Sequence, residues 1–318
     1  MQLIYYIVFI KFLILFNMNF AISCTFNCAD KVNVPESIWK PEMDNVFDYV
    51  STGFSPSDIT TNLEWEPNNI AWDNSFITGN INGETVFRVQ SREGLRNEGV
   101  QDMEDSKKHS HSRAEYKTTD SSRFIFGDSS KIEYSFYVPK EVKFSGHSAN
   151  LFGQMHGFHS DTTVWSVMTL PTNETGHLKY EMISEYEKKQ TYLRGKDLVF
   201  RICGALDAQG HPRLCTNFLL SQEGVYQGKW NTIEILTKFG KGKNGALKVI
   251  FNGNTIVDCI CDVSLDHEDY KSEHEEFAKR DVAFSFQFGI HRFLVNPEKA
   301  SEVVDPVVYY KNVKVIKQ

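Results

Sequence analysis

The feature that most constrains the fold is a series of short segments in which apolar and polar residues alternate, separated by turn-forming Gly, Asn and Asp. Alternation over such short lengths predicts half-buried β-strands, and turns such as Asn252-Gly253 join strands into hairpins. Helical periodicity is scarce, and the best helical segment is 268–279. The pattern predicts an all-β sandwich of two antiparallel sheets.

The expected strands are the following: Phe76–Thr78, Thr85–Gln90, Ser112–Lys117, Ile132–Val138, Leu151–Gly157, Val164–Leu170, His177–Ser184, Leu198–Cys203, Asn231–Thr237, Leu247–Asn252, Val282–Arg292 and Val307–Ile316. Neither an internal repeat nor a low-complexity linker divides them. We therefore expect one β-jelly roll over residues 61–318, preceded by a turn-rich lead-in over 24–60, and a monomer.

The amino terminus has the pattern of a secretory signal. The run from Leu3 to Phe16 is apolar apart from Lys11, and Ala21-Ile22-Ser23 then fits a cleavage site before Cys24. We expect residues 1–23 to be removed and the protein to be secreted or periplasmic. An uncleaved anchor and a lipid attached to Cys24 are the alternatives. No later segment approaches the ~20 apolar residues of a membrane span.

Export makes the six cysteines candidates for disulfides. Cys203 and Cys215 flank a turn-rich loop, so we expect them to bridge. Cys259 and Cys261 lie two apart and would point to the same side of a strand, so we expect them not to bridge each other, and one or both to pair with Cys24 or Cys28. Unpaired buried thiols are the alternative. No Cys/His spacing predicts a zinc site.

The charge limits the class of partner. The net charge is −7 and the pI is near 5.8, which excludes nucleic acid as the main partner because phosphate binding needs a basic surface. A local cluster of Lys and Arg on an acidic protein would still attract a polyanion.

Three of the expected strands carry chemically useful side chains on one face. Alternation groups Arg113, Glu115 and Lys117 on the first, and Gln154 and His156 on the second. On the third, Phe284, Phe286, Phe288 and Ile290 form the core side, and the opposite side carries Ser285, Gln287, Gly289 and His291. Charged residues in a row suit a wet cleft better than a core. We expect one concave face that binds a ligand.

These segments, in this order, resemble the motifs of jelly-roll polysaccharide lyases of the alginate-lyase and heparin-lyase I types, which are R-x-E-x-R, Q-x-H and K-x-G-x-Y. The matching segments are Arg113-Ala-Glu-Tyr-Lys117, Gln154-Met-His156 and Gln287-Phe-Gly-Ile-His291. The resemblance covers roughly residues 85–315, and it implies a concanavalin-like jelly roll that cleaves an acidic, uronate-containing polysaccharide by β-elimination.

The chemistry of elimination explains these residue types. Removal of the proton next to a uronate carboxylate develops charge on that group, and fixed donors such as Arg113 and Gln154 would stabilise it. His156 suits the base that takes the C5 proton, because an unperturbed imidazole has a pKa near ~6.5. In the family that the chain resembles, a Tyr on the third strand is the acid, or both acid and base.

Two positions depart from the family pattern. Lys117 replaces the last Arg of the first motif, and His291 replaces the Tyr. We expect His291 to act as general acid. Tyr116 lies on the opposite face, and Tyr180, Tyr186 and Tyr192 are alternatives among which spacing does not choose.

Further residues are expected to bind substrate. With Glu115, Lys117 and Gln287 we include Tyr180 and Arg194, and other basic residues are Lys188, Lys189, Lys196 and the loop 238–243. No cofactor is expected. Calcium is an alternative near Asp258, Asp262, Asp266 and Glu268, although no compact D-x-D-x-D-G loop is present.

Two other functions compete with the lyase. One is a carbohydrate-binding protein of the same fold without catalysis, which the change from Tyr to His291 favours. The other is a glycoside hydrolase, whose paired carboxylates find their nearest match at Glu181, Glu185 and Glu187, without the central Asp. Unsaturated-sugar absorbance would separate the lyase from both.

Overall fold

A computed structural model describes residues 42–68, 75–91, 111–144, 148–157, 163–169, 197–203, 215–222, 224–240, 242–263, 283–294 and 306–318. All of them belong to a compact unit, Pro41–Gln318. The predicted signal segment, the predicted strand 177–184 and the predicted helix 268–279 lie outside the described residues.

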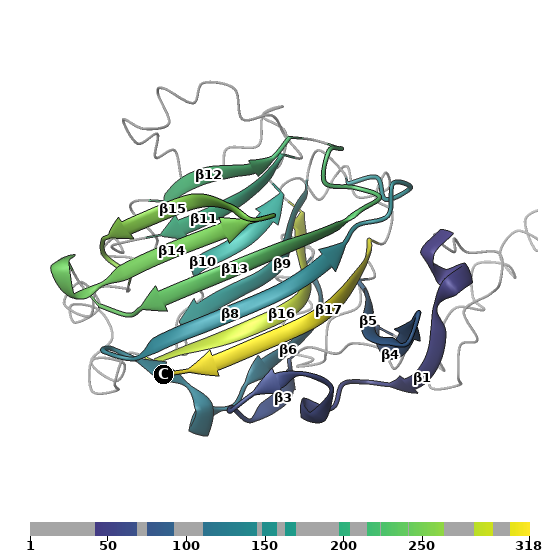
Figure 1. Ribbon diagram of the computed structural model, residues 1–318, viewed down its shortest axis with the longest axis horizontal. Coiled ribbons are helices and arrows are strands. Elements are labelled where there is room, and N and C mark those ends of the chain that lie inside the picture. Colours follow the sequence, from purple (N-terminus) through teal and green to yellow (C-terminus); the bar gives the residue numbers. More distant parts are fainter. Residues whose placement is uncertain are drawn as a thin grey trace, which may run out of the picture. The chain divides into compact units, whose positions relative to one another are not determined.

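The described residues form two β-sheets that pack face to face (Figure 1). Sheet 1 has the order β1-β4-β5-β17-β8-β13-β14-β15, with the short β2 beside β17, and sheet 2 has the order β12-β11-β10-β9-β16-β6-β3, with the short β7 beside β16. Neighbouring strands are antiparallel except for the parallel pair β2–β17. The predicted fold class, an all-β jelly-roll sandwich, is confirmed.

The strands of sheet 1 are β1 (Asp48–Thr52), β2 (Thr60–Thr61), β4 (Phe76–Ile81), β5 (Glu84–Gln90), β8 (Ser129–Tyr137), β13 (Trp230–Lys238), β14 (Ala246–Phe251), β15 (Asn254–Ile260) and β17 (Val307–Lys317). The strands of sheet 2 are β3 (Trp65–Asn68), β6 (His111–Thr118), β7 (Phe124–Ile125), β9 (Ser148–Gly157), β10 (Thr163–Thr169), β11 (Leu198–Cys203), β12 (Cys215–Ser221) and β16 (Ala283–Leu294). Short 3-10 helices are η1 (Glu42–Val46), η2 (Pro56–Asp58), η4 (Asp120–Ser122) and η5 (Gly242–Asn244). β1 lies within the range that we expected to be a lead-in.

Aromatic side chains fill the space between the sheets. The predicted core side of β16 is fully buried, and Phe286 contacts Trp165 of β10 with ring centroids 5.8 Å apart. Phe288 meets Tyr310 of β17 at 5.9 Å, in an edge-to-face arrangement that suits aromatic rings. The alternation read from the sequence therefore places the opposite side of β16 on the outer face of sheet 2.

Two tyrosines of sheet 1 contact glycines of sheet 2. The Tyr310 hydroxyl donates a 2.7 Å hydrogen bond to the carbonyl oxygen of Gly289, and the Tyr134 hydroxyl occupies the space where a Cβ on Gly153 would lie. Phe152, the neighbour of Gly153, also points to sheet 1, where it stacks on Phe136. Two successive residues facing the core interrupt the alternation of β9, and the β9–β10 register shifts at this place.

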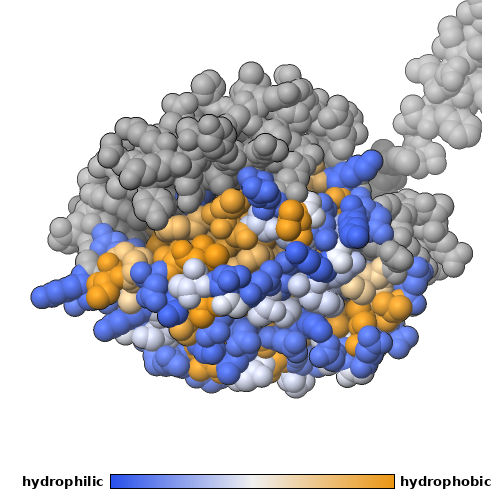
Figure 2. Space-filling view, turned by 45° about the horizontal axis from the view of Figure 1, so that its top comes forward, coloured by the Kyte–Doolittle hydropathy of each residue, from blue (hydrophilic) through white to orange (hydrophobic). Residues whose placement is uncertain are grey.

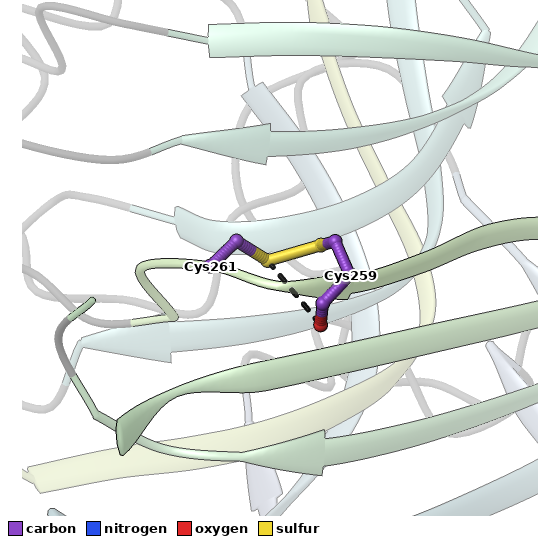
Figure 3. Close-up of a disulfide and its surroundings, with 2 residues drawn as sticks. All are labelled: Cys259 and Cys261. Atoms are coloured by element: carbon purple, nitrogen blue, oxygen red, sulfur yellow. Dashed lines mark hydrogen bonds between the residues drawn. A yellow bond between two sulfur atoms is a disulfide. The ribbon is translucent and has the colours of Figure 1, made fainter. Parts of the chain in front are cut away.

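The cysteines differ in part from expectation. Cys259 and Cys261 form a disulfide with a Cα–Cα distance of 5.6 Å, so the prediction that they would not bridge each other is wrong (Figure 3). β15 ends at Ile260, and Cys261 therefore lies beyond the strand geometry on which that prediction rested. Cys203 is disulfide-bonded and stands directly opposite Cys215 in the β11–β12 register, in agreement with the predicted pairing.

The exposed surface of the unit mixes hydrophilic and hydrophobic areas (Figure 2). Large exposed hydrophobic side chains include Tyr49 and Val50 of β1 and Ile260 at the end of β15. Among the described residues, none of the helices has the length and apolar character that crossing a membrane would require.

Candidate active site

The outer face of sheet 2 brings the three motif strands together. β16 lies between β9 and β6, and Gln287 stands opposite Gln154 on one side and Lys117 on the other. Residues directly opposite in an antiparallel pair share a face of the sheet. His291 likewise stands opposite Arg113. Segments separated by more than 170 positions of sequence thus supply one surface.

The amide of Gln154 joins all three strands. Its Nε2 donates to Oε1 of Glu115 at 2.9 Å and to Oε1 of Gln287 at 3.0 Å, and it lies 3.5 Å from Nδ1 of His291. Its Oε1 accepts from the hydroxyl of Thr163 at 3.2 Å. Both hydrogens of the Gln154 amide are therefore used to link neighbouring strands. We call Glu115, Gln154, Gln287 and His291 the floor of the site.

The hydrogen bond of His156 favours one tautomer of its imidazole. Nδ1 of His156 lies 2.8 Å from the carbonyl oxygen of Gly157, which only accepts, so Nδ1 carries the proton and Nε2 carries the basic lone pair. Both hydrogens of the Gln154 amide are donated to Glu115 and Gln287, so the 3.5 Å contact between Nε2 of Gln154 and Nδ1 of His291 fixes no tautomer of His291. The neutral imidazole of His156 is therefore suited to take a proton through Nε2, whereas His291 can give one only as an imidazolium, which carries a proton on both ring nitrogens.

The floor of the site is buried. Glu115, Gln154, Gln287 and His291 are 0%, 1%, 5% and 6% exposed, whereas Arg113, His156 and Lys117 are half-buried. We had expected this side of β16 to be open, but the residues of the central strands are covered and bonded to one another. Arg113, His156 and Lys117 are thus the more accessible side chains of the three motifs.

Burial changes the acidity of Glu115. Desolvation raises the pKa of its carboxyl to about 7, against the opposing effects of the Arg113 charge and the Gln154 hydrogen bond. Oε2 of this carboxyl has no hydrogen-bond partner within the described part of the chain. Such a group is poorly placed to bind a substrate anion directly, and its contacts suit the orientation of Gln154.

Arg113 and Lys117 differ in their partners. Lys117 forms a 2.9 Å ion pair with Glu66 of β3. No hydrogen bond or ion pair of the Arg113 guanidinium is found among the described residues. This half-buried cation lies near Glu115, whose raised pKa favours the neutral carboxyl below about pH 7. The local charge around Arg113 is therefore suited to an anionic ligand.

Three tyrosine hydroxyls lie on the core side of sheet 2. Tyr116 packs on Phe54 and Phe76 and accepts a hydrogen bond from the Phe54 N–H, as its predicted position on the opposite face requires. Tyr134 and Tyr310 rise from sheet 1, and burial raises the pKa of both hydroxyls well above the ordinary value. None of these three replaces the family tyrosine. Tyr180, Tyr186, Tyr192 and Arg194 lie outside the described residues.

Sequence reasoning missed several polar residues on the same face. Thr163 and Ser166 of β10, Arg201 of β11 and Asn217 of β12 all belong to it. The signal was present in β11, where Arg201 alternates with the core residue Phe200. Gln287 also stands where the family pattern has Lys, a third departure.

Comparison with known proteins now identifies the family. The family model described as polysaccharide lyase matches residues 58–314. The chain belongs to the polysaccharide lyase family. The resemblance stated from the three motifs is confirmed, and the enzyme class is that of a carbon–oxygen lyase.

Several solved structures are similar to this polysaccharide lyase. An endo-β-1,4-glucuronan lyase from the fungus Trichoderma reesei is 11% identical, with a TM-score of 0.45 over 85% of this chain and 93% of that one. An alginate lyase from Alteromonas sp. 272 is 15% identical, with a TM-score of 0.42 over 87% and 96%. No curated protein matches the sequence. The family assignment rests on the family model.

No group of three or more His, Cys, Asp or Glu that could hold a metal ion occurs in the described ranges. Of the four acidic residues proposed for calcium, Asp258 pairs with Lys248 at 2.9 Å, and Asp266 and Glu268 lie outside the described residues. Calcium binding stays a prediction.

Proposed function

We propose that this polysaccharide lyase cleaves a uronate-containing polysaccharide by β-elimination at the outer face of sheet 2. The observation that carries the proposal is the contact of the Gln154 amide with Glu115, Gln287 and His291, since it gathers residues of all three motif strands at hydrogen-bond range. The similar structures named as glucuronan and alginate lyases agree with a uronate substrate.

In the proposed reaction His156 takes the C5 proton through Nε2. The electrons of the C5–H bond form the C4–C5 double bond, and the C4–O bond breaks with its electrons on the leaving oxygen. His291, in its imidazolium form, gives a proton to that oxygen and becomes neutral. Arg113 stabilises the negative charge that develops on the uronate carboxylate in the transition state. Gln154 holds His291 and Glu115 in place. For Gln154 to donate to the uronate carboxylate as well, its amide must turn towards the substrate.

A non-catalytic carbohydrate-binding protein is the second candidate. It is favoured by the tyrosines, because the hydroxyls of Tyr116, Tyr134 and Tyr310 face the core. The hydrolase alternative rests on Glu181, Glu185 and Glu187, which lie outside the described residues.

One assay separates these functions. The protein is mixed with glucuronan, alginate and sulfated glycosaminoglycans, and the absorbance of the unsaturated product is followed over time. Absorbance with the wild type and its loss in His156→Ala support elimination. Binding of a polyanion without absorbance at any pH would establish the binding protein, and new reducing ends without absorbance would establish a hydrolase.

We also infer export to an oxidising compartment. The Cys259–Cys261 disulfide and the disulfide-bonded Cys203 fit such a compartment, where disulfides persist. For the amino terminus we propose removal of residues 1–23, with a lipid attached to Cys24 as the alternative. We also propose that the protein is a monomer. Amino-terminal sequencing of the exported protein would test the cleavage site.

A further inference from the structure

A row of polar side chains crosses sheet 2 from edge to edge. Each member stands directly opposite the next in the strand register, on β12, β11, β10, β9, β16, β6 and β3 in turn. Directly opposed residues share a face. The row consists of Asn217, Arg201, Ser166, Gln154, Gln287, Lys117 and Glu66.

Side-chain contacts agree with this common face. Arg201 Nε donates to Oδ1 of Asn217 at 2.8 Å at one end of the row. Lys117 pairs with Glu66 at the other end, and Gln154 bonds Gln287 in the middle. Beneath the row, Phe200 and Trp165 contact each other in the core at 5.7 Å, so Arg201 and Ser166 must point outwards.

The spacing suits an extended polymer. Neighbouring strands lie about 4.8 Å apart, so Arg201 is roughly 10 Å from Gln154, two strands away across β10. Lys117 lies two strands away on the other side. A chain lying across the strands would therefore meet a cation on each side of the proposed reaction centre.

The charge and geometry of Arg201 distinguish it from Lys117. The guanidinium is half-buried, and Asn217, 8% exposed, fixes its plane through Nε. A planar, oriented fork of donors matches a carboxylate better than a point charge does. If the Arg201–Asn217 pair had only a structural role, it would stabilise the β11–β12 edge without contributing to substrate affinity.

We propose that Arg201, oriented by Asn217, forms a distal subsite that binds a carboxylate of the acidic polysaccharide, two strands from the reacting sugar. This inference rests on the proposed function, because it assigns a second anchor to the same substrate. It predicts that long chains gain affinity from Arg201, whereas oligosaccharides too short to span the row gain none.

The test compares the wild type with Arg201→Gln, Arg201→Lys and Asn217→Ala, with Lys248→Gln on β14 of sheet 1 as a matched loss of charge. Substrates are the polyuronate that the wild type cleaves and its size-fractionated short oligosaccharides. For Arg201→Gln we expect KM on the polymer to rise about tenfold, the usual scale for a charged hydrogen bond, with kcat within twofold and short oligosaccharides unaffected. Arg201→Lys and Asn217→Ala should lie between, and Lys248→Gln should match the wild type.

The outcomes separate this subsite from the proposed function. Unchanged KM on the polymer, or an equal loss on short and long substrates, would overturn the subsite while leaving the lyase in place. If the wild type cleaves no polyuronate, the proposed function fails. Retardation of each variant in native gels containing alginate or glucuronan then decides, since equal retardation of the wild type and Arg201→Gln would also refute the subsite. If Arg201→Gln fails to fold, Arg201→Lys and Asn217→Ala carry the same comparison.

Discussion

Gln154 Nε2 donates a 2.9 Å hydrogen bond to Oε1 of Glu115, a carboxyl that is completely buried. The same amide bonds Gln287 and approaches His291, so the protonation of Glu115 acts directly on the group that orients the proposed proton donor. A buried polar network of this kind stabilises one arrangement only when its members are satisfied. In the proposed mechanism Glu115 is thus a positioning residue whose charge state bears on both stability and catalysis.

Replacement of Glu115 should change how stability depends on pH. The folded-state pKa is raised from 4.5 to about 7, so the fold binds the proton more tightly than the unfolded chain and loses stability as pH rises between these values. The loss amounts to about 3 kcal/mol at full ionisation. Glu115→Gln removes it, so the free energy of unfolding of the variant should gain on the wild type from pH 4.5 to 7 and then stay level.

Denaturant titrations across this range measure the difference. Glu133→Gln on the outer side of β8 is the matched control, because it removes a carboxylate that is not buried. A constant offset between Glu115→Gln and the wild type at all pH values would show that the carboxyl is not protonated more readily in the fold.

His291 should determine the alkaline limb of the pH–rate profile. If two imidazoles take and give the proton, the rate falls on both sides of near-neutral pH, whereas a tyrosine acid with a pKa near ~10 would leave the alkaline limb higher. His291→Ala should reduce kcat by about 10²-fold or more, and His291→Tyr should shift the alkaline limb upwards. An active His291→Ala beside an inactive His156→Ala would assign the acid to another residue.

Gly289 should tolerate no side chain. Its φ is +131°, and a Cβ there would overlap the carbonyl oxygen of Ala114 on the neighbouring strand β6. Gly289→Ala should therefore lower the free energy of unfolding by roughly 3 kcal/mol from strain and displacement of β6. Gly253→Ala provides the comparison, because Gly253 has φ +81° but open space around it, so only the backbone cost of about 1 kcal/mol applies. Equal losses measured by thermal unfolding would contradict the overlap.

Peptide mapping without reduction should find Cys203 linked to Cys215, and Cys259 linked to Cys261. Loss of the first bridge in Cys203→Ser/Cys215→Ser should cost about 3 kcal/mol, the scale expected for closing a loop of this length. A peptide that joins Cys203 to Cys24 or Cys28 would show that the register alone does not decide the pairing.

The sequence by itself determined which side of β16 faces the core. Along β16 the alternation of Phe284, Phe286 and Phe288 with polar residues is enough, because a strand has two faces and apolar side chains are driven to the dry one. The motif residues Arg113 and His291 follow from the same parity. Order along the chain then sufficed for the family resemblance.

Only the tertiary structure decided which distant residues meet. The contacts of Gln154 with Glu115 and Gln287, and the row that contains Arg201, depend on strand order and register. These follow from how two whole sheets pack rather than from any local pattern. Local rules also fail where a strand is irregular. Phe152 and Gly153 both face the core, where Gly153 packs against Tyr134, so β9 departs from the two-residue period. Cys261 lies beyond the end of β15, so strand alternation does not apply to it and it can bridge Cys259.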